Sequence, residues 1–238
     1  MVDDFFVSKL IWDSEFFSKK IAHLNFVTNA ENGQKLSDFE LIQAKVPTEN
    51  YHQINILNNL GFKLVEGEVD FSLWIKDKSS TDLSKYPCLV ELASIADVEE
   101  IKTIIENNFN LSRYRQPWFS INERDSFYQL WAEKAIKGTF DDVCLKLKVG
   151  ATIRGFITLK VENSIARIGL ISVATHFQQQ GVGKLLLNMS VQYCQTHNIG
   201  QLFVATQLAN KAAISLYSKF GFSINTLSYW FYKTHDSL

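Results

Sequence analysis

The residues with the clearest chemical potential form a run of glutamines and glycines, Gln178-Gln179-Gln180-Gly181-Val182-Gly183, followed by Lys184. The run stands between an apolar stretch and an amphipathic one, so we expect a loop that leads from a strand into a helix. Glycines let the backbone approach a ligand closely, and the unpaired N–H groups at the start of a helix attract a phosphate. A tight turn without a ligand is the alternative, and the loop alone does not decide between the two.

Two familiar phosphate-binding loops do not fit this run. A Walker loop would need glycine where Gln178 stands and Ser or Thr where Leu185 stands. A dinucleotide-binding fingerprint would need glycine where Leu186 stands. A phosphate ligand of this loop would therefore be held by a different kind of site.

Tyr217 is a candidate proton donor. It follows Asn210 by seven residues in a predicted helix, which is about two turns, so both side chains face the same side. A phenol can donate a proton. A core aromatic is the alternative, and the spacing by itself favours it.

Arg113, Arg115 and Trp118 are candidates for binding a substrate. The two arginines could pair with a diphosphate, and the tryptophan could stack on a base or a sugar. Packing of the loop by Trp118, with both arginines solvated, is an equal alternative.

Acidic residues alternate along a predicted strand at Glu66, Glu68 and Asp70. They could position an amine or a water that relays its proton. Such alternation more often marks one solvated face of a strand, and this interpretation is favoured.

The elements that would position these residues follow a mixed order after residue 85. Alternating apolar residues predict strands, and apolar residues at helical spacing predict helices. A mixed order of this kind predicts an α/β fold with a central sheet and helices on both faces. In chain order the expected elements are a strand at 88–92, helices at 97–109 and 126–137, strands at 143–149, 153–160 and 166–173, a helix from 182, a strand at 201–206, a helix at 210–220 and a strand at 227–233.

The first part of the chain resembles its end, which indicates an internal repeat; a chance match of common Asn caps and Gly stops is the alternative. Residues 50–62 align without gaps on residues 210–222: in both, an asparagine opens a helix and a Gly-Phe pair closes it, and an aromatic-rich strand follows. Residues 76–85 contain almost no apolar side chain and predict a linker. We therefore expect a truncated, non-catalytic domain at 1–84 and a catalytic domain at 85–238.

The order of elements and the pattern Gln-x-x-Gly-x-Gly at 178–183 resemble the acetyl-CoA site of the GNAT superfamily. The resemblance implies a GNAT fold in which the strand before the loop parts from its neighbour and pantetheine lies in the gap. It implies acetyl-CoA as a co-substrate, with no permanently bound cofactor. On this chain, Ile171, Ser172 and Val173 would offer backbone groups to pantetheine, Gln178, Gln179, Gln180, Gly181, Val182, Gly183 and Lys184 would hold the pyrophosphate, Asn210 would reach the CoA arm, and Tyr217 would be the general acid.

A narrower resemblance is carried by the stretches 43–45 with 60–70, 112–119 with 138–141, and 166–170 with 204–207 and Tyr217. These are similar to the dTDP-fucosamine acetyltransferases of enterobacterial common antigen biosynthesis. The resemblance implies transfer of acetyl to the 4-amino group of a dTDP-4-amino-4,6-dideoxyhexose, with the N-terminal domain lining the acceptor site. Arg113, Arg115, Trp118 and Glu68 are the expected substrate-binding residues. A GNAT acting on a peptide, protein or other small amine, and a non-catalytic CoA-binding module, are the alternatives.

Composition limits the other classes of function. The chain has 24 Lys and Arg against 25 Asp and Glu, so no global basic excess exists to hold nucleic acid or an anionic membrane. Its acidic start and the absence of an apolar run of about 18 residues predict a cytoplasmic protein without a membrane span. Three scattered cysteines and five isolated histidines predict reduced thiols and no metal site. The oligomeric state stays open, a homodimer included.

Overall fold

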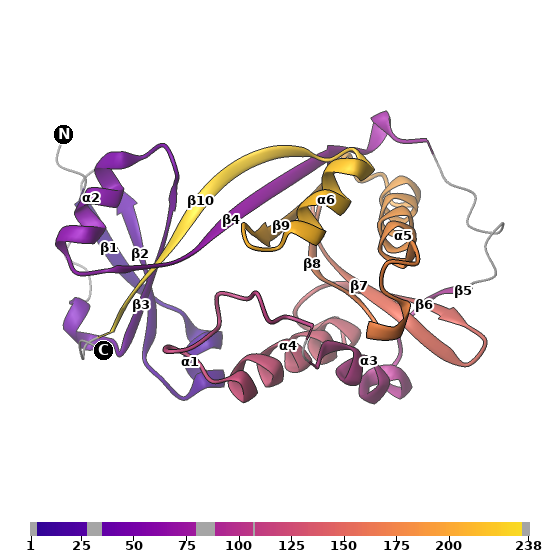
Figure 1. Ribbon diagram of the computed structural model, residues 1–238, viewed down its shortest axis with the longest axis horizontal. Coiled ribbons are helices and arrows are strands. Elements are labelled where there is room, and N and C mark those ends of the chain that lie inside the picture. Colours follow the sequence, from indigo (N-terminus) through magenta and orange to yellow (C-terminus); the bar gives the residue numbers. More distant parts are fainter. Residues whose placement is uncertain (1–3, 28–34, 80–88, 107, 235–238) are drawn as a thin grey trace. The chain divides into compact units, whose positions relative to one another are not determined.

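The computed structural model describes residues 4–27, 35–79, 89–106 and 108–234 (Figure 1). The chain divides into two compact units. The first is made of Met1–Val69, Gln207–Ala209 and Thr226–Leu238, and the second of Asp70–Thr206 and Asn210–Asn225. The strands β4 (Lys63–Trp74) and β10 (Ser223–Thr234) contribute residues to both units.

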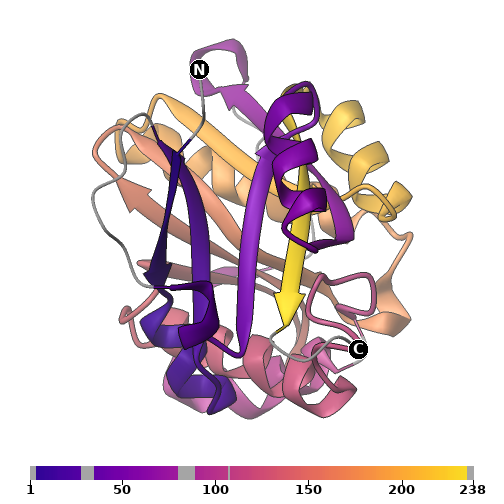
Figure 2. The same cartoon turned by 90° about the vertical axis from the view of Figure 1, so that its left-hand side faces the viewer.

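The first unit is a sheet with the strand order β1-β2-β3-β10-β4 (Figure 2). β1 is antiparallel to β2, β2 is parallel to β3, and β10 is antiparallel to β3. Besides its parts of β4 and β10, the unit contains β1 (Asp4–Lys9), α1 (Ile11–Phe17), β2 (Ile21–Val27), η1 (Leu36–Asp38), β3 (Leu41–Pro47) and α2 (Tyr51–Asn59).

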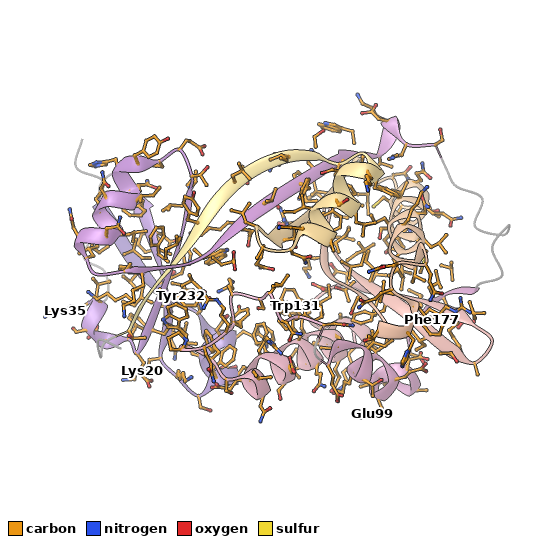
Figure 3. All side chains as sticks on the ribbon, viewed as in Figure 1. Lys20, Lys35, Glu99, Trp131, Phe177 and Tyr232 are labelled. Atoms are coloured by element: carbon orange, nitrogen blue, oxygen red, sulfur yellow. The ribbon has the colours of Figure 1, made fainter. Side chains whose placement is uncertain are left out.

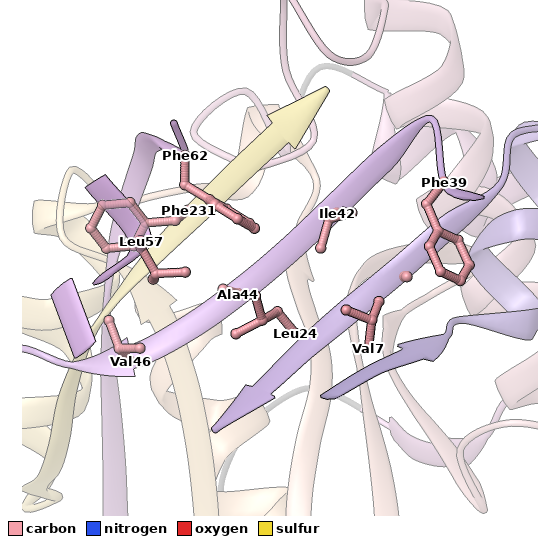
Figure 4. Close-up of a cluster of buried hydrophobic side chains, with 10 residues drawn as sticks. Val7, Leu24, Phe39, Ile42, Ala44, Val46, Leu57, Phe62 and Phe231 are labelled. Atoms are coloured by element: carbon pink, nitrogen blue, oxygen red, sulfur yellow. The ribbon is translucent and has the colours of Figure 1, made fainter. Parts of the chain in front are cut away.

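The core of the first unit lies between the sheet and α2 (Figure 4). Leu57 of α2 is fully buried, and Phe62, just after the helix, is 4% exposed. They belong to one cluster with strand residues that include Ala44, Val46 and Phe231. Burying these apolar side chains is the main force that holds α2 on the sheet.

The second unit has the strand order β4-β9-β8-β7-β6-β5. β5 to β8 pair antiparallel in succession, and β8 is parallel to β9. Helices cover both faces, α3 and α4 on one and α5 and α6 on the other (Figure 1). Its elements are η2 (Ile75–Asp77), β5 (Leu89–Leu92), η4 (Ile95–Asp97), α3 (Val98–Ile105), α4 (Ile121–Ile136), β6 (Val143–Val149), β7 (Thr152–Glu162), β8 (Ile165–Val173), η5 (Thr175–Phe177), α5 (Val182–Thr196), β9 (Gln201–Gln207) and α6 (Lys211–Phe220).

The expected elements of the second unit are present, with differences at their ends. α4 begins at Ile121 rather than 126, because Ser120 caps it: the Ser120 Oγ accepts from the Glu123 N–H, and the Glu123 carboxylate accepts from the Ser120 N–H. α3 ends at Ile105 rather than 109, because Glu106 leaves the helical region with φ −50° and ψ 124°. The mixed sheet with helices on both faces is confirmed.

The N-terminal region also contains the helix and the strand expected between residues 50 and 75. β3, α2 and β4 begin at residues 41, 51 and 63, and β9, α6 and β10 begin at 201, 211 and 223, each 160 positions later. The compact units do not follow a single cut in the chain, since residues 226–234 of β10 belong to the first unit. The expected boundary at 84/85, and residues 80–85 of the expected linker, lie outside the described residues.

Within the described ranges, no helix is both long enough and apolar enough to span a membrane.

Candidate active site

β8 and β9 pair over four residues and then part. Their register runs from Ile165 opposite Gln201 to Ile168 opposite Val204, although β8 continues to Val173 and β9 to Gln207. Backbone groups along the unpaired part of β8 that face β9 therefore have no strand partner on that side, and a ligand could use them.

The side of β8 that faces this gap follows from two hydrogen bonds. The Leu170 N–H donates to the Thr158 Oγ1 at 2.8 Å, and the Ala174 N–H donates to the Arg154 carbonyl at 2.9 Å, and both acceptors belong to β7. Because successive backbone groups of a strand point to opposite sides, the groups of Ile171 and Val173 point away from β7 and into the gap. Of the three residues expected to meet pantetheine, Ser172 thus directs its backbone to β7.

The loop after β8 is exposed and leads into the N-terminus of α5, where an anion could bind. Gln179 (φ 59°) and Gly181 (φ 82°) adopt left-handed conformations, and residues 178–181 are exposed. Gly181 is the N-cap of α5 and supplies no side chain to cap it, so the first N–H groups of the helix stay available. A phosphate would find both these donors and the positive end of the helix dipole there.

Gly183 has a packing role of its own. A Cβ built on it would lie 3.1 Å from the Leu216 Cδ2 of α6. The missing side chain therefore lets α5 and α6 pack closely, in addition to any approach of a ligand.

The glutamine side chains of the loop bond to the protein itself. The Gln178 Nε2 donates to the Asn108 Oδ1 at 3.2 Å and to the Val173 carbonyl at 3.4 Å, and the Gln180 Nε2 donates to the His176 carbonyl at 2.8 Å. Asn108 in turn donates to the Ser172 Oγ and to the Val173 carbonyl. Sequence reasoning missed Asn108, because a single asparagine after a helix carries no distinguishing pattern.

Asn210 and Tyr217 are both ordered by α6. The Asn210 Oδ1 accepts from the Ala213 N–H at 3.1 Å and caps the helix. Tyr217 is 2% exposed, and its ring packs 5.6 Å from Phe71 and 5.8 Å from Phe222. Burial raises the pKa of the Tyr217 phenol, so it keeps its proton at neutral pH, as a general acid must.

The loop with Arg113, Arg115 and Trp118 is anchored by buried aromatic side chains and presents both arginines. Arg113 donates to the Tyr114 hydroxyl at 2.7 Å, and its guanidinium lies 4.2 Å from the centre of that ring. Arg115 is exposed, and its guanidinium lies 5.4 Å from the centre of the Trp118 ring. The structure thus gathers the three candidates on one loop and holds the two cations against aromatic rings.

The acidic residues of β4 are not a solvated face, and that expectation is wrong for Glu68 and Asp70. Glu68, 8% exposed, is ion-paired with Lys45 and accepts from the Trp230 indole N–H at 2.8 Å within the first unit. Asp70, 6% exposed, accepts from Arg167 at 2.5 Å within the second unit. Their partners lie far away in sequence, so the local alternation could not reveal them.

Among the described residues, no group of His, Cys, Asp and Glu side chains is arranged to hold a metal ion.

Comparisons with known proteins identify relatives along the chain. The acetyltransferase (GNAT) family profile matches residues 108–222. The chain is 30% identical over 231 residues to the dTDP-fucosamine acetyltransferase of Escherichia coli O6:H1, covering 95% of this chain and 97% of that protein. It is 31% identical over 106 residues to the [ribosomal protein bS18]-alanine N-acetyltransferase of Salmonella typhimurium, covering 44% of this chain and 72% of that one. Among solved structures, the tandem GNAT protein from the clavulanic acid biosynthesis pathway superposes with a TM-score of 0.62 at 11% identity, over 92% of this chain and 76% of that chain.

Proposed function

Because the chain belongs to the GNAT family of acetyltransferases, and is thus an acetyl-CoA-dependent N-acetyltransferase, we propose that it acetylates the 4-amino group of a dTDP-4-amino-4,6-dideoxyhexose. The favoured acceptor is the galactose epimer, dTDP-fucosamine, and the product would enter surface-polysaccharide biosynthesis. The observation that carries the proposal is the 30% identity to a dTDP-fucosamine acetyltransferase over 95% of this chain, because it includes the N-terminal region.

The gap between β8 and β9 is the proposed binding site of acetyl-CoA. Pantetheine would lie along Ile171 and Val173, where the Val173 N–H faces the gap and the Val173 carbonyl already accepts from Asn108 and Gln178. The pyrophosphate would lie on the loop from Gln178 to Lys184. The Gln178 side chain would brace this loop rather than touch the phosphates, because it already bonds to Asn108. Asn210 would approach the CoA arm through the rest of its amide, since its oxygen caps α6.

Tyr217 is the proposed general acid. The amine nitrogen attacks the thioester carbonyl, the C–S bond breaks, and the departing sulfur takes the phenolic proton. The phenolate then recovers a proton from solvent, and the amine loses its own to water. Burial raises the pKa of Tyr217, so the phenol carries its proton at neutral pH, and the same burial makes the phenolate less favourable than that of an exposed tyrosine.

The acceptor would be held by the loop with Arg113, Arg115 and Trp118. A guanidinium pairs well with a diphosphate, and an aromatic ring stacks on a base or sugar. Glu68 and the N-terminal domain at residues 1–84, which we propose to be a truncated GNAT copy without catalysis, would help to form the acceptor site.

The test is steady-state kinetics with acetyl-CoA and five acceptors: the two dTDP-4-amino epimers, a 3-amino isomer, a UDP analogue and a peptide amine. We expect the highest kcat/KM with a dTDP-4-amino sugar, and we expect Arg115→Ala to raise KM for the sugar nucleotide more than KM for acetyl-CoA. Efficient acetylation of the peptide, with none of any sugar nucleotide, would make the substrate proposal wrong.

A peptide or protein amine is the second candidate acceptor. The 31% identity to a [ribosomal protein bS18]-alanine N-acetyltransferase favours it. That similarity spans only 44% of this chain, however, against 95% for the dTDP-fucosamine acetyltransferase. The amino-sugar nucleotide therefore stays the favoured acceptor.

A further inference from the structure

A chain of buried hydrogen bonds reaches the backbone of β8 beside the gap. The Leu170 N–H donates to the Thr158 Oγ1, and that hydroxyl donates to the Asp141 Oδ2 at 2.5 Å. The same carboxylate oxygen accepts from the indole N–H of Trp131 at 2.8 Å. Trp131 lies on α4 and is labelled in Figure 3. Thr158 is fully buried and Asp141 is 3% exposed, so water does not compete for these bonds.

The hydrogen bonds lie at a β-bulge. Ile157 pairs with Ile171, but Leu159 pairs with Ile168, so Thr158 alone faces both Gly169 and Leu170. A bulge leaves one residue of the longer strand without its ladder partner. Here the Thr158 side chain takes the Leu170 N–H that the ladder would otherwise have bonded.

The bulge decides which backbone groups of β8 face the gap. One extra residue reverses the alternation along the strand, so fixing the Leu170 N–H toward β7 turns the Ile171 N–H toward β9. A Cβ on Gly169 would lie 2.2 Å from the Asp141 Oδ2, so the carboxylate occupies the space where a side chain would stand. Asp141 therefore fits closely against the bulge that it helps to hold.

The contacts continue from Trp131 to the loop with Arg113 and Arg115. The Trp131 ring stacks on Tyr128 at 6.2 Å between centres, and the Tyr128 hydroxyl lies 2.7 Å from the Ser112 Oγ at the start of that loop. A single packed path thus joins the proposed acceptor loop to the strand beside the proposed acetyl-CoA site.

We propose that Thr158 and Asp141 are positioning residues for acetyl transfer, which fix the bulge so that the Ile171 N–H meets the thioester carbonyl of acetyl-CoA. The proposal rests on the function proposed above. A backbone donor preset toward the carbonyl oxygen stabilises the charge that develops there when the amine attacks, without reorganisation during the reaction.

The test compares Thr158→Val, which removes the hydroxyl at nearly constant shape, with Thr158→Ser, which keeps it. We expect Thr158→Val to lower kcat roughly 10- to 100-fold, because a small misplacement of a catalytic donor costs about that much. Its Kd for acetyl-CoA should rise roughly 2- to 10-fold, the worth of one hydrogen bond, with Kd for CoA unchanged. Thr158→Ser should restore both quantities.

Ser14→Ala is the matched control. Ser14 is also a buried hydroxyl that accepts a backbone N–H, from Ile21 at 3.0 Å, and donates to a buried oxygen, but it lies in the first unit. It should lower the melting temperature about as much as Thr158→Val does and leave kcat unchanged. If Thr158→Val does not fold, Trp131→Phe removes the other donor to Asp141 and should lower kcat in the same direction by a smaller factor.

Two outcomes would overturn the positioning role: a wild-type kcat in stably folded Thr158→Val, or equal changes in its Kd for acetyl-CoA and CoA. Calorimetric titration needs no acceptor, so these affinities decide the role of Thr158 even if no sugar nucleotide is acetylated. Failure of every sugar nucleotide with the wild type would contradict the proposed acceptor alone.

Discussion

Residues 41–74 and residues 201–234 each fold into a strand, a helix and a strand, and the helices begin in the same way. Asn50 caps α2 with φ −86° and ψ 70°, and Asn210 caps α6 with φ −84° and ψ 71°. Each asparagine accepts a hydrogen bond from the backbone N–H three residues later, at 3.2 Å and 3.1 Å. An asparagine at the N-cap therefore specifies the same helix start in both regions.

The two helices also end alike. Gly61 and Gly221 take the left-handed conformation, with φ 80° and 107°. The Phe62 N–H then donates to the Leu57 carbonyl at 2.9 Å, and the Phe222 N–H to the Tyr217 carbonyl at 3.0 Å. Leu57 and Tyr217 thus occupy equivalent positions, one apolar and one able to give a proton.

The larger difference between the two regions lies in the elements that precede β3 and β9. β8 is joined to β9 through the glycine loop and the 15-residue helix α5, whereas the only described helical element between β2 and β3 is the three-residue η1. The two regions share the residues that fix the backbone, and they differ in the residues that could bind a phosphate or move a proton. Local capping signals therefore predict the fold of both regions and the function of neither.

The largest expected effect is at Tyr217, where the second region has a phenol and the first has Leu57. Tyr217→Phe should lower kcat about 100-fold, the low end for loss of a general acid, because a thiolate is already a fair leaving group. Kd for acetyl-CoA should stay near the wild-type value. Leu57→Met, a volume-conserving change at the equivalent position, is the control and should keep full activity. Wild-type turnover in Tyr217→Phe would mean that the ring only packs.

The glycines that end the helices should differ in their tolerance of a side chain. Ala at either position must adopt a left-handed conformation, which costs about 1–2 kcal/mol of unfolding free energy. Gly221→Ala should cost more than Gly61→Ala, because its Cβ would also lie 3.0 Å from the Lys78 Nζ, against 3.8 Å from the Lys233 Nζ at Gly61. Urea unfolding of both variants measures the difference, and an equal cost would contradict this reading of the contacts.

Removing the capping asparagines should have a smaller effect, and one of the same size on the stability of both helices. Asn50→Ala and Asn210→Ala should each lower the unfolding free energy by about 1 kcal/mol through loss of the cap. Only Asn210→Ala should also raise KM for acetyl-CoA, if Asn210 reaches the CoA arm as proposed. An unchanged KM would leave Asn210 the same purely structural role as Asn50.

The smallest expected effect concerns the pH dependence of kcat, which should stay level on the alkaline side. Burial raises the pKa of Tyr217, so the phenol remains protonated at about pH 10, where an ordinary tyrosine would lose half its protons. Because the raised value favours the protonated acid, kcat should not fall as pH rises through that range. Stopped assays of wild type and Tyr217→Phe across this range check the sign, and a decline in the wild type alone would contradict it.

The sequence predicts well those structural features that depend on residues close together in the chain. The alternation at 143–149 predicts β6 with its observed ends, because alternate residues of a strand lie on the same face. The burial of Glu68 and Asp70 was missed, because the partner of Asp70 is Arg167, 97 positions away. The link from Thr158 to Asp141 and Leu170 was missed for the same reason, since it depends on a bulge that no local pattern encodes.

β10 has a consequence for the order in which the protein is completed. Its residues Ser228 to Thr234 pair with β3, so the first unit lacks one of its inner strands until β10 has been made. At about 5–20 residues per second, the ribosome needs roughly 10–40 s more after β3 to supply it. During this time β3 is an open sheet edge on a nascent chain, available to the wrong partner. The first unit, which contains β1, is therefore completed only after the elements from β5 to α6 have been made.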